Sequence, residues 1–167
     1  ARVLGIGYPG GAPMDRLSRT GDAGRYAFPR VQVHDAPLDM SFSGLKTAAI
    51  NLIHNARQKE EALDLPSLAA SFSAAVSDML VPRVMEAARR CGRRKVAVAG
   101  GVAANSRIRA DLEAACAAAG CRLYLPPLSL CGDNGAMIGC QAYYEYLAGH
   151  TADMALNAYA NRDIAKG

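Results

Sequence analysis

The amino-acid sequence predicts an α/β fold that is rich in helix and contains a short parallel sheet. Two segments of mostly apolar residues, KVAVAG at 95–100 and CRLYLPP at 121–127, have the character of buried strands. Each is followed by a segment with helical periodicity, and this order and spacing are typical of a parallel βαβα unit. With 167 residues, 51% of them hydrophobic, the chain is long enough for a real core, so we expect residues 1–167 to form a single domain.

The N-terminal half is predicted to alternate turns with helices. A short helix is expected in APMDRLSRTGD (12–22), directly after the turn YPGG. RVQVHDAPLDMSFSG (30–44) alternates and is rich in turn residues, which favours a small hairpin or two extended pieces. Ser43 is the expected N-cap of the next helix, and an acidic loop at 60–66 follows it. The apolar face of that helix comprises Leu45, Ala48, Ala49, Leu52 and Ile53.

The C-terminal half contains the longest predicted helix and the strand–helix repeat. The long helix should run over 67–90, with Pro82 bending or dividing it. The helix after the first strand is expected at 105–120, with Gly120 as its C-terminal stop. The last helix, GDNGAMIGCQAYYEYLAG, is expected at 132–149.

Cysteine, histidine and hydropathy patterns exclude several classes of protein. The five cysteines are odd in number and lack CxxC spacing, which argues against a disulfide framework and a zinc knot and favours reduced thiols filling the core. The three histidines form no HxxxH or HExxH pair, so this chain cannot build a complete histidine-based metal site. We expect no bilayer-spanning window, no signal peptide and no membrane partner, and hence a cytoplasmic location.

The net charge of +4 is less informative than the clustering of the cations. RRCGRRK places five basic residues within 89–95, at a helix end and the following turn. Cations there complement the helix dipole, and we favour this reading over a nucleic-acid patch.

Two loops at the carboxyl ends of the predicted strands are the expected ligand site, because parallel α/β units bind ligands there. They are AGGVAAN (99–105) and PPLSLCGDNG (126–135). Gly100 and Gly101 allow a sharp turn and a close approach to a nucleobase or ribose. Asn105 is placed to hydrogen-bond a ligand hydroxyl, and a plain turn with an N-cap is the alternative.

Acidic residues near two other turns are further candidates. Asp133 begins the last helix, either as a cap or as a carboxylate for a cation, which would need additional ligands from elsewhere. Gly11 belongs to a tight turn, and Asp15 lies one helical turn later. This pair either lines a polar ligand or forms a simple connection.

Five segments, in order and with consistent spacing, resemble one family across nearly the whole chain. They are GIGYPGGAPMDRL (5–17), RYAFPR (25–30), LDMSFSGLKTA (38–48), VAVAGGVAANSRIR (96–109) and CGDNGAMIG (131–139). They are similar to the transferase subunit of tRNA threonylcarbamoyladenosine synthesis (the TsaD family), formerly named O-sialoglycoprotein endopeptidase. The resemblance implies part of the second lobe of an actin-like, sugar-kinase-like ATPase fold. The family's HxxxH and SGGHT segments are missing here, so we expect a C-terminal portion that is inactive by itself.

The resemblance also implies an activity and its participants. The family transfers a threonylcarbamoyl group from threonylcarbamoyl-adenylate to the tRNA adenosine next to the anticodon. By resemblance, substrate binding falls to Gly11, Asp15, Gly100, Gly101 and Asn105. Asp133 corresponds to one ligand of a single iron or zinc ion, and the expected partners are tRNA, other subunits of the threonylcarbamoyladenosine complex and a second copy in a homodimer. Two alternatives are another actin-like ATPase or kinase, and a non-catalytic binding paralogue.

Overall fold

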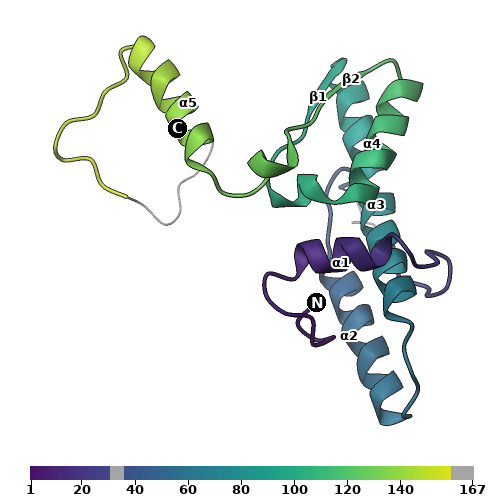
Figure 1. The fold of residues 1–167 in the computed structure, drawn as a ribbon. Coiled ribbons are helices and arrows are strands. Elements are labelled where there is room, and N and C mark those ends of the chain that lie inside the picture. Colours follow the sequence, from purple (N-terminus) through teal and green to yellow (C-terminus); the bar gives the residue numbers. More distant parts are fainter. Residues whose placement is uncertain (31–35, 159–167) are drawn as a thin grey trace. The chain divides into compact units, whose positions relative to one another are not determined.

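The protein is described by a computed structural model that covers residues 1–30 and 36–158 (Figure 1). The chain divides into two compact units, residues 1–132 and 133–167. The single domain expected for residues 1–167 stays a prediction.

The first unit begins with three helices, α1 (Gly11–Ser18), α2 (Ser43–Gln58) and α3 (Leu65–Arg90) (Figure 1). Helices α2 and α3 contribute most of its larger core. Leu45 and Ile53 of α2 are buried in one cluster with Leu68 and Met79 of α3. The predicted apolar face of α2 is confirmed, because its remaining members pack against the same cluster. Helix α1 contacts α3, and the short helix expected within 12–22 is therefore present.

The predicted cap of α2 is wrong, and so is one of the two effects predicted for Pro82, the division of α3; the other, a bend, stays a prediction. Ser43 is the first residue of α2 rather than its cap, since the backbone of Phe42 is already helical and no side chain caps this end. Pro82 does not divide α3, which continues through it to Arg90. Because proline has no N–H, the carbonyl of Asp78, four positions earlier, loses its helical donor without ending the helix.

Within the described part of the chain, α3 is also the one helix that is long and apolar enough, by length and composition, to cross a membrane. The expectation that no window reaches this hydropathy is wrong for α3. The reason is its position, because 56% of that window is buried inside the protein, and a helix surrounded by neighbours is apolar around most of its circumference.

Buried serines of α3 hold the segment that follows α1. Ser67 Oγ accepts from the amide of Asp22 at 3.0 Å, and Ser71 Oγ accepts from the amide of Tyr26 at 3.2 Å. Gly21 approaches so closely that a Cβ there would lie 2.1 Å from the carbonyl carbon of Pro66. The hairpin or extended pieces expected at 30–44 fall partly outside the described residues, and residues 36–42 form a turn and irregular chain without a strand.

A two-stranded parallel sheet and one helix complete the first unit. Strands β1 (Lys95–Ala97) and β2 (Arg122–Tyr124) pair in parallel, and α4 (Ser106–Ala118) connects them. α4 packs against α3 and β2, with Ile108 and Leu112 fully buried. The predicted strand–helix–strand order is confirmed, and Gly120, at φ +64°, ends α4 as expected. Short 3₁₀ turns lie at Gly101–Ala104 and Leu128–Leu130.

The second unit is described over residues 133–158 and contains helix α5 (Gly135–Leu147). Asn134 caps this helix by accepting from the amide of Met137 at 2.9 Å. No residue of α5 is buried, and the Tyr143 and Tyr144 rings meet edge-on at 5.7 Å between centroids. The predicted last helix is therefore present.

The cysteines only partly follow the prediction. All five are free thiols, and Cys116 and Cys131 fill core space as expected. Cys91 and Cys140 are exposed, because Cys91 follows the last residue of α3 and α5 has no buried residue.

Candidate functional site

The turn between β1 and α4 has the geometry that a close-approach loop requires. Gly100 adopts φ +87° and ψ 172°, a conformation that is essentially restricted to glycine. Gly101 then opens the 3₁₀ turn that leads into α4. A Cβ added at either glycine would meet no protein atom within 4 Å, so the space above both residues is open. The double glycine therefore shapes the loop and leaves one side of its backbone accessible.

Asn105 joins this loop to α4, and of its side-chain amide only the oxygen is hydrogen-bonded within the described residues. Its Oδ1 accepts from the amide of Ile108 at 3.0 Å, which makes it the N-cap of the helix. In the part of the chain that the structure describes, the Asn105 amide nitrogen has no hydrogen-bond partner. An amide nitrogen carries two donors, so Asn105 can cap the helix and still donate to a ligand oxygen.

Asp15 links α1 to the same helix start. Its Oδ1 accepts from both the backbone amide and the hydroxyl of Ser106, at 2.7 and 2.8 Å, and its Oδ2 accepts from Arg19 at 2.7 Å. Burial raises the pKa of Asp15, but the hydrogen bonds from Ser106 and Arg19 outweigh it, so its pKa lies below the ordinary 3.8. An ionised carboxylate at the first residue of α4 is also favoured by the helix dipole.

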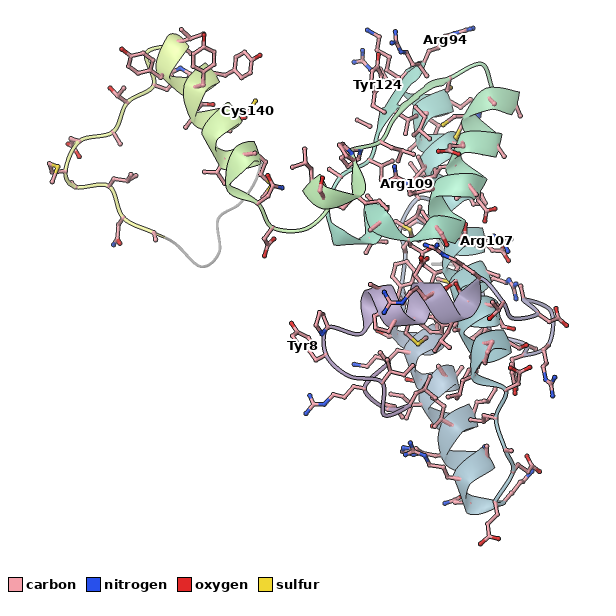
Figure 2. The ribbon with its side chains drawn as sticks, in the orientation of Figure 1. Tyr8, Arg94, Arg107, Arg109, Tyr124 and Cys140 are labelled. Atoms are coloured by element: carbon pink, nitrogen blue, oxygen red, sulfur yellow. The ribbon has the colours of Figure 1, made fainter. Side chains whose placement is uncertain are left out.

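The Arg109 side chain (labelled in Figure 2) is hydrogen-bonded to both of the loops that follow the two strands. Its Nη1 donates to the Ala103 carbonyl at 2.8 Å, and its Nη2 donates to the Pro126 carbonyl at 3.1 Å. Nη1 also lies 3.8 Å from the buried Cys131 Sγ. One guanidinium thus fixes the carboxyl-end loops of β1 and β2 side by side.

Gly11 stands at the start of α1, away from these hydrogen bonds. It lines a hollow of about 520 Å³ together with residues of the first turns, among them Tyr8 and Gly10. The side chain of Tyr8 is fully exposed there. A second, apolar hollow of about 230 Å³ lies under Val3 and Leu4, with Lys46 at its edge.

Asp133 belongs to the second unit and is exposed. Because Asn134 is the helix cap, capping does not occupy the Asp133 carboxylate. Over residues 1–30 and 36–158, no group of three His, Cys, Asp or Glu side chains could hold a metal ion. The role of Asp133 as a metal ligand stays a prediction.

The first unit brings most of the predicted site residues together. Gly100, Gly101 and Asn105 occupy one turn, and Asp15 is hydrogen-bonded to Ser106, the next residue along. Among the described residues, no hydrogen bond joins Gly11 to that turn. Sequence reasoning missed Ser106 and Arg109. Arg109 binds main-chain carbonyls, which carry no sequence signature, and Asp15 and Ser106 are separated by 91 positions.

Comparison with known proteins identifies similar sequences along almost all of the chain. Residues 1–140 match the family model described as TsaD, tRNA N6-adenosine threonylcarbamoyltransferase. Curated proteins of that name are 48% identical over 95% of this chain in Moorella thermoacetica and 46% identical over 98% in Staphylococcus saprophyticus. One from Clostridium botulinum is 43% identical over 99%. The chain spans about half the length of these relatives, from 46% to 49%.

Proposed function

The chain belongs to the tRNA N6-adenosine threonylcarbamoyltransferase family, and from this premise we propose that it supplies the adenylate-binding part of such a transferase. The activity is transfer of a threonylcarbamoyl group from threonylcarbamoyl-adenylate to the amine of a tRNA adenosine next to the anticodon. The substrates of the protein are then the adenylate and tRNA.

The observation that carries this proposal is the open glycine turn at the carboxyl end of β1. Gly100 and Gly101 leave the backbone free on one side, and the Asn105 amide nitrogen lies at the end of the same turn. A flat adenosine fits such a surface, with Asn105 donating to one of its oxygens. Asp15 already accepts three hydrogen bonds, so its contribution is to position α1 and Ser106 against the loop, with one remaining lone pair available to a ribose hydroxyl.

The transfer itself makes modest demands on the protein. The exocyclic amine attacks the carbonyl carbon, the bond from that carbon to the phosphate oxygen breaks, AMP leaves, and the amine loses a proton. Because AMP is a good leaving group, no nucleophilic side chain is required, and holding the two reactants together supplies much of the acceleration. The glycine turn and Asn105 hold the leaving group in this scheme.

A divalent iron or zinc ion, implied by the family resemblance, fits this chain only in part. We propose that Asp133 donates one carboxylate oxygen to it. Since a single carboxylate does not hold such an ion and the described residues contain no group of three donors, the other ligands must come from elsewhere. No step of the transfer is derived through the ion.

The wider setting follows from the same proposal. We place the protein in the cytoplasm, where tRNA is available. Other subunits of the threonylcarbamoyladenosine complex and a second copy of the chain are proposed partners.

The test uses Gly101→Ala in the full-length gene product, with transfer of the threonylcarbamoyl group to unmodified tRNA as the readout. A methyl group at this position meets no protein atom within 4 Å, so the fold should be unaffected. It would occupy the space assigned to the adenosine, and misplacing a substrate by about 1 Å costs up to about 100-fold. We expect the KM for the adenylate to rise at least about tenfold while the melting temperature stays unchanged.

Gly139→Ala is the matched control, because a Cβ there also meets nothing within 4 Å but lies in α5. It should leave the KM unchanged. An unaltered KM in Gly101→Ala would remove the glycine turn from the adenylate site, and an absence of transfer by the parent protein would remove the function itself.

A further inference from the structure

The outer face of the two-stranded sheet carries cations that have no acidic partner among the described residues. Along β1 and β2 the burial alternates, with Val96 and Leu123 facing the core and Lys95, Arg122 and Tyr124 exposed. Arg93 and Arg94 enter β1 at the same end and are exposed too. We define Arg93, Arg94, Lys95, Arg122 and Tyr124 as the basic strand patch.

The patch differs from the rest of the RRCGRRK segment. Arg89 and Arg90 both donate to Glu86, at 2.7 Å, and these bonds hold the Glu86 pKa at about 2. This part of the segment is a helix end that satisfies its own charges, as the sequence indicated. Lys95 instead pairs with Arg122 across the strands, and the Arg122 amide donates to the Arg94 carbonyl at 2.7 Å. Arg122 is 27 positions away from Lys95, so it could not be assigned to the cluster from the sequence.

One residue pair of the sheet is electrostatically unfavourable. Lys95 and Arg122 are direct partners in the parallel register, so two like charges lie on neighbouring strands with side chains on the same face. Like charges placed opposite each other destabilise a sheet. A fold that keeps such a conflict on its surface usually has a functional use for it.

The rest of the patch has the chemistry of a nucleic-acid surface. The Arg122 guanidinium lies 5.1 Å from the centre of the Tyr124 ring, and both Arg94 and Tyr124 project outwards from the strands (Figure 2). Three of its four cations are arginines, whose planar forks match phosphate oxygens. An exposed ring beside a guanidinium is a platform for an unpaired base. An apolar partner bound here would remove water from the four cations without giving them counter-charges. A polyanion would supply a negative charge for each of them.

We propose that the basic strand patch binds the phosphate backbone of RNA, as a docking surface for tRNA separate from the adenylate loop. The inference rests on the proposed function, which requires that the protein engage tRNA. The cations of the patch lie at the amino ends of β1 and β2, and Tyr124 lies two residues further along β2. The adenylate loop follows the carboxyl end of β1, so one large RNA can reach both.

The experiment measures binding of an unmodified tRNA transcript to the full-length gene product by fluorescence anisotropy, between about 50 and 200 mM salt. The test variant is Arg94→Ala/Arg122→Ala. Each lost phosphate contact lowers the slope of log K against log salt by about 1, so we expect a slope about 2 smaller and at least about tenfold weaker binding at low salt. Arg94→Lys/Arg122→Lys keeps both charges and should keep most of the slope.

The matched control is Arg57→Ala/Lys59→Ala, which removes the same charge at the end of α2. It should bind tRNA as the parent does, and equal losses in both double variants would overturn the patch by showing a general charge effect. If a double variant unfolds at lower temperature, the single variant Arg94→Gln, with an expected slope change of about 1, decides in its place.

Transfer activity separates the two proposals. A parent protein that transfers the threonylcarbamoyl group, combined with a test variant of unchanged affinity and slope, overturns the patch and leaves the proposed function intact. A parent that neither binds tRNA nor transfers the group overturns both. Unchanged tRNA binding with loss of an acidic protein partner would reassign the patch and count against RNA.

Discussion

The carboxyl ends of β1 and β2 differ from their amino ends in how their charged side chains are used. At the carboxyl ends, Asp15 is enclosed by hydrogen bonds from Ser106 and Arg19, and Arg109 donates to two main-chain carbonyls. At the amino ends, Lys95 and Arg122 face the same side of the sheet with no acid beside them in the described residues. The strands between are only three residues long.

This difference indicates which charges serve the fold and which are available to a partner. A charge that is hydrogen-bonded and partly buried costs stability when it is removed, because its partners lose their bonds. Removing an exposed charge that lies beside a like charge leaves the free energy of unfolding unchanged or raises it. Substitutions at the two ends should therefore change stability in opposite directions.

The largest effect is expected for Asp15→Ala. The substitution leaves the Ser106 amide and hydroxyl without their acceptor and breaks the pair with Arg19. Hydrogen bonds to a charged group contribute about 1.5–3 kcal/mol, so the free energy of unfolding should fall by about 2–3 kcal/mol. Urea denaturation of the full-length gene product measures this. A loss below about 0.5 kcal/mol, which is typical of a surface site, would contradict the structural role of Asp15.

The pH dependence of this effect has a definite sign. Since the folded pKa of Asp15 lies below the unfolded value, its contribution is present above about pH 4 and is lost as the pH falls through the folded pKa. The stability difference between the parent and Asp15→Asn should therefore shrink on acidification below about pH 4. A difference that grows on acidification would mean that the carboxyl is protonated in the folded protein.

A smaller loss of stability is expected for Arg109→Ala, which removes the hydrogen bonds to both carbonyls and so the link between the two loops. The free energy of unfolding should fall by about 1–2 kcal/mol, because each hydrogen bond from the guanidinium contributes about that order. Hydrogen exchange should accelerate in the loops 98–105 and 125–131 rather than across α3. Arg109→Lys cannot span both carbonyls and should resemble the alanine variant, whereas full protection in the lysine variant would show that charge alone suffices.

The sequence predicted the elements of this fold better than the contacts between them. The helical period along α2 and the apolar runs of β1 and β2 were sufficient, because both depend on local pattern and burial. The cap at Ser43 was misplaced by one residue, since the backbone of Phe42 is already helical and no side chain caps this end of α2. Pro82 was expected to bend or divide α3; the helix is not divided, and the bend stays a prediction.

The sequence predicted where the glycine turn lies in the fold but not the hydrogen bonds around it. That this turn is the ligand site stays a prediction. Gly100 stands where a parallel strand ends, and a rule of topology places ligands there. The bonds of Asp15 and Arg109 could not be predicted, because they join segments that are distant in sequence or end on carbonyl groups that every residue has. The pairing of Lys95 with Arg122 depends on the register of the strands, and a slip of one residue would have placed the two side chains on opposite faces.

The smallest effect, and the one of opposite sign, is expected for Lys95→Glu. The substitution replaces a repulsion with an attraction to Arg122 across the strands, on an exposed face where no other contact is lost. The free energy of unfolding should rise by about 0.2–0.5 kcal/mol, and the gain should shrink at about 1 M salt because exposed charges are screened. Urea denaturation at low and high salt, with an unchanged m-value, provides the measurement.

Lys95→Gln is the control, since it removes the repulsion without adding an attraction and should give about half of the gain. Binding of tRNA by Lys95→Glu should weaken at the same time, so the substitution stabilises the fold while impairing the patch. A loss of stability in Lys95→Glu would mean that the lysine is needed by the fold itself. The contrast between the two ends of the strands would then fail, because the amino-end cations would be structural just as Asp15 and Arg109 are.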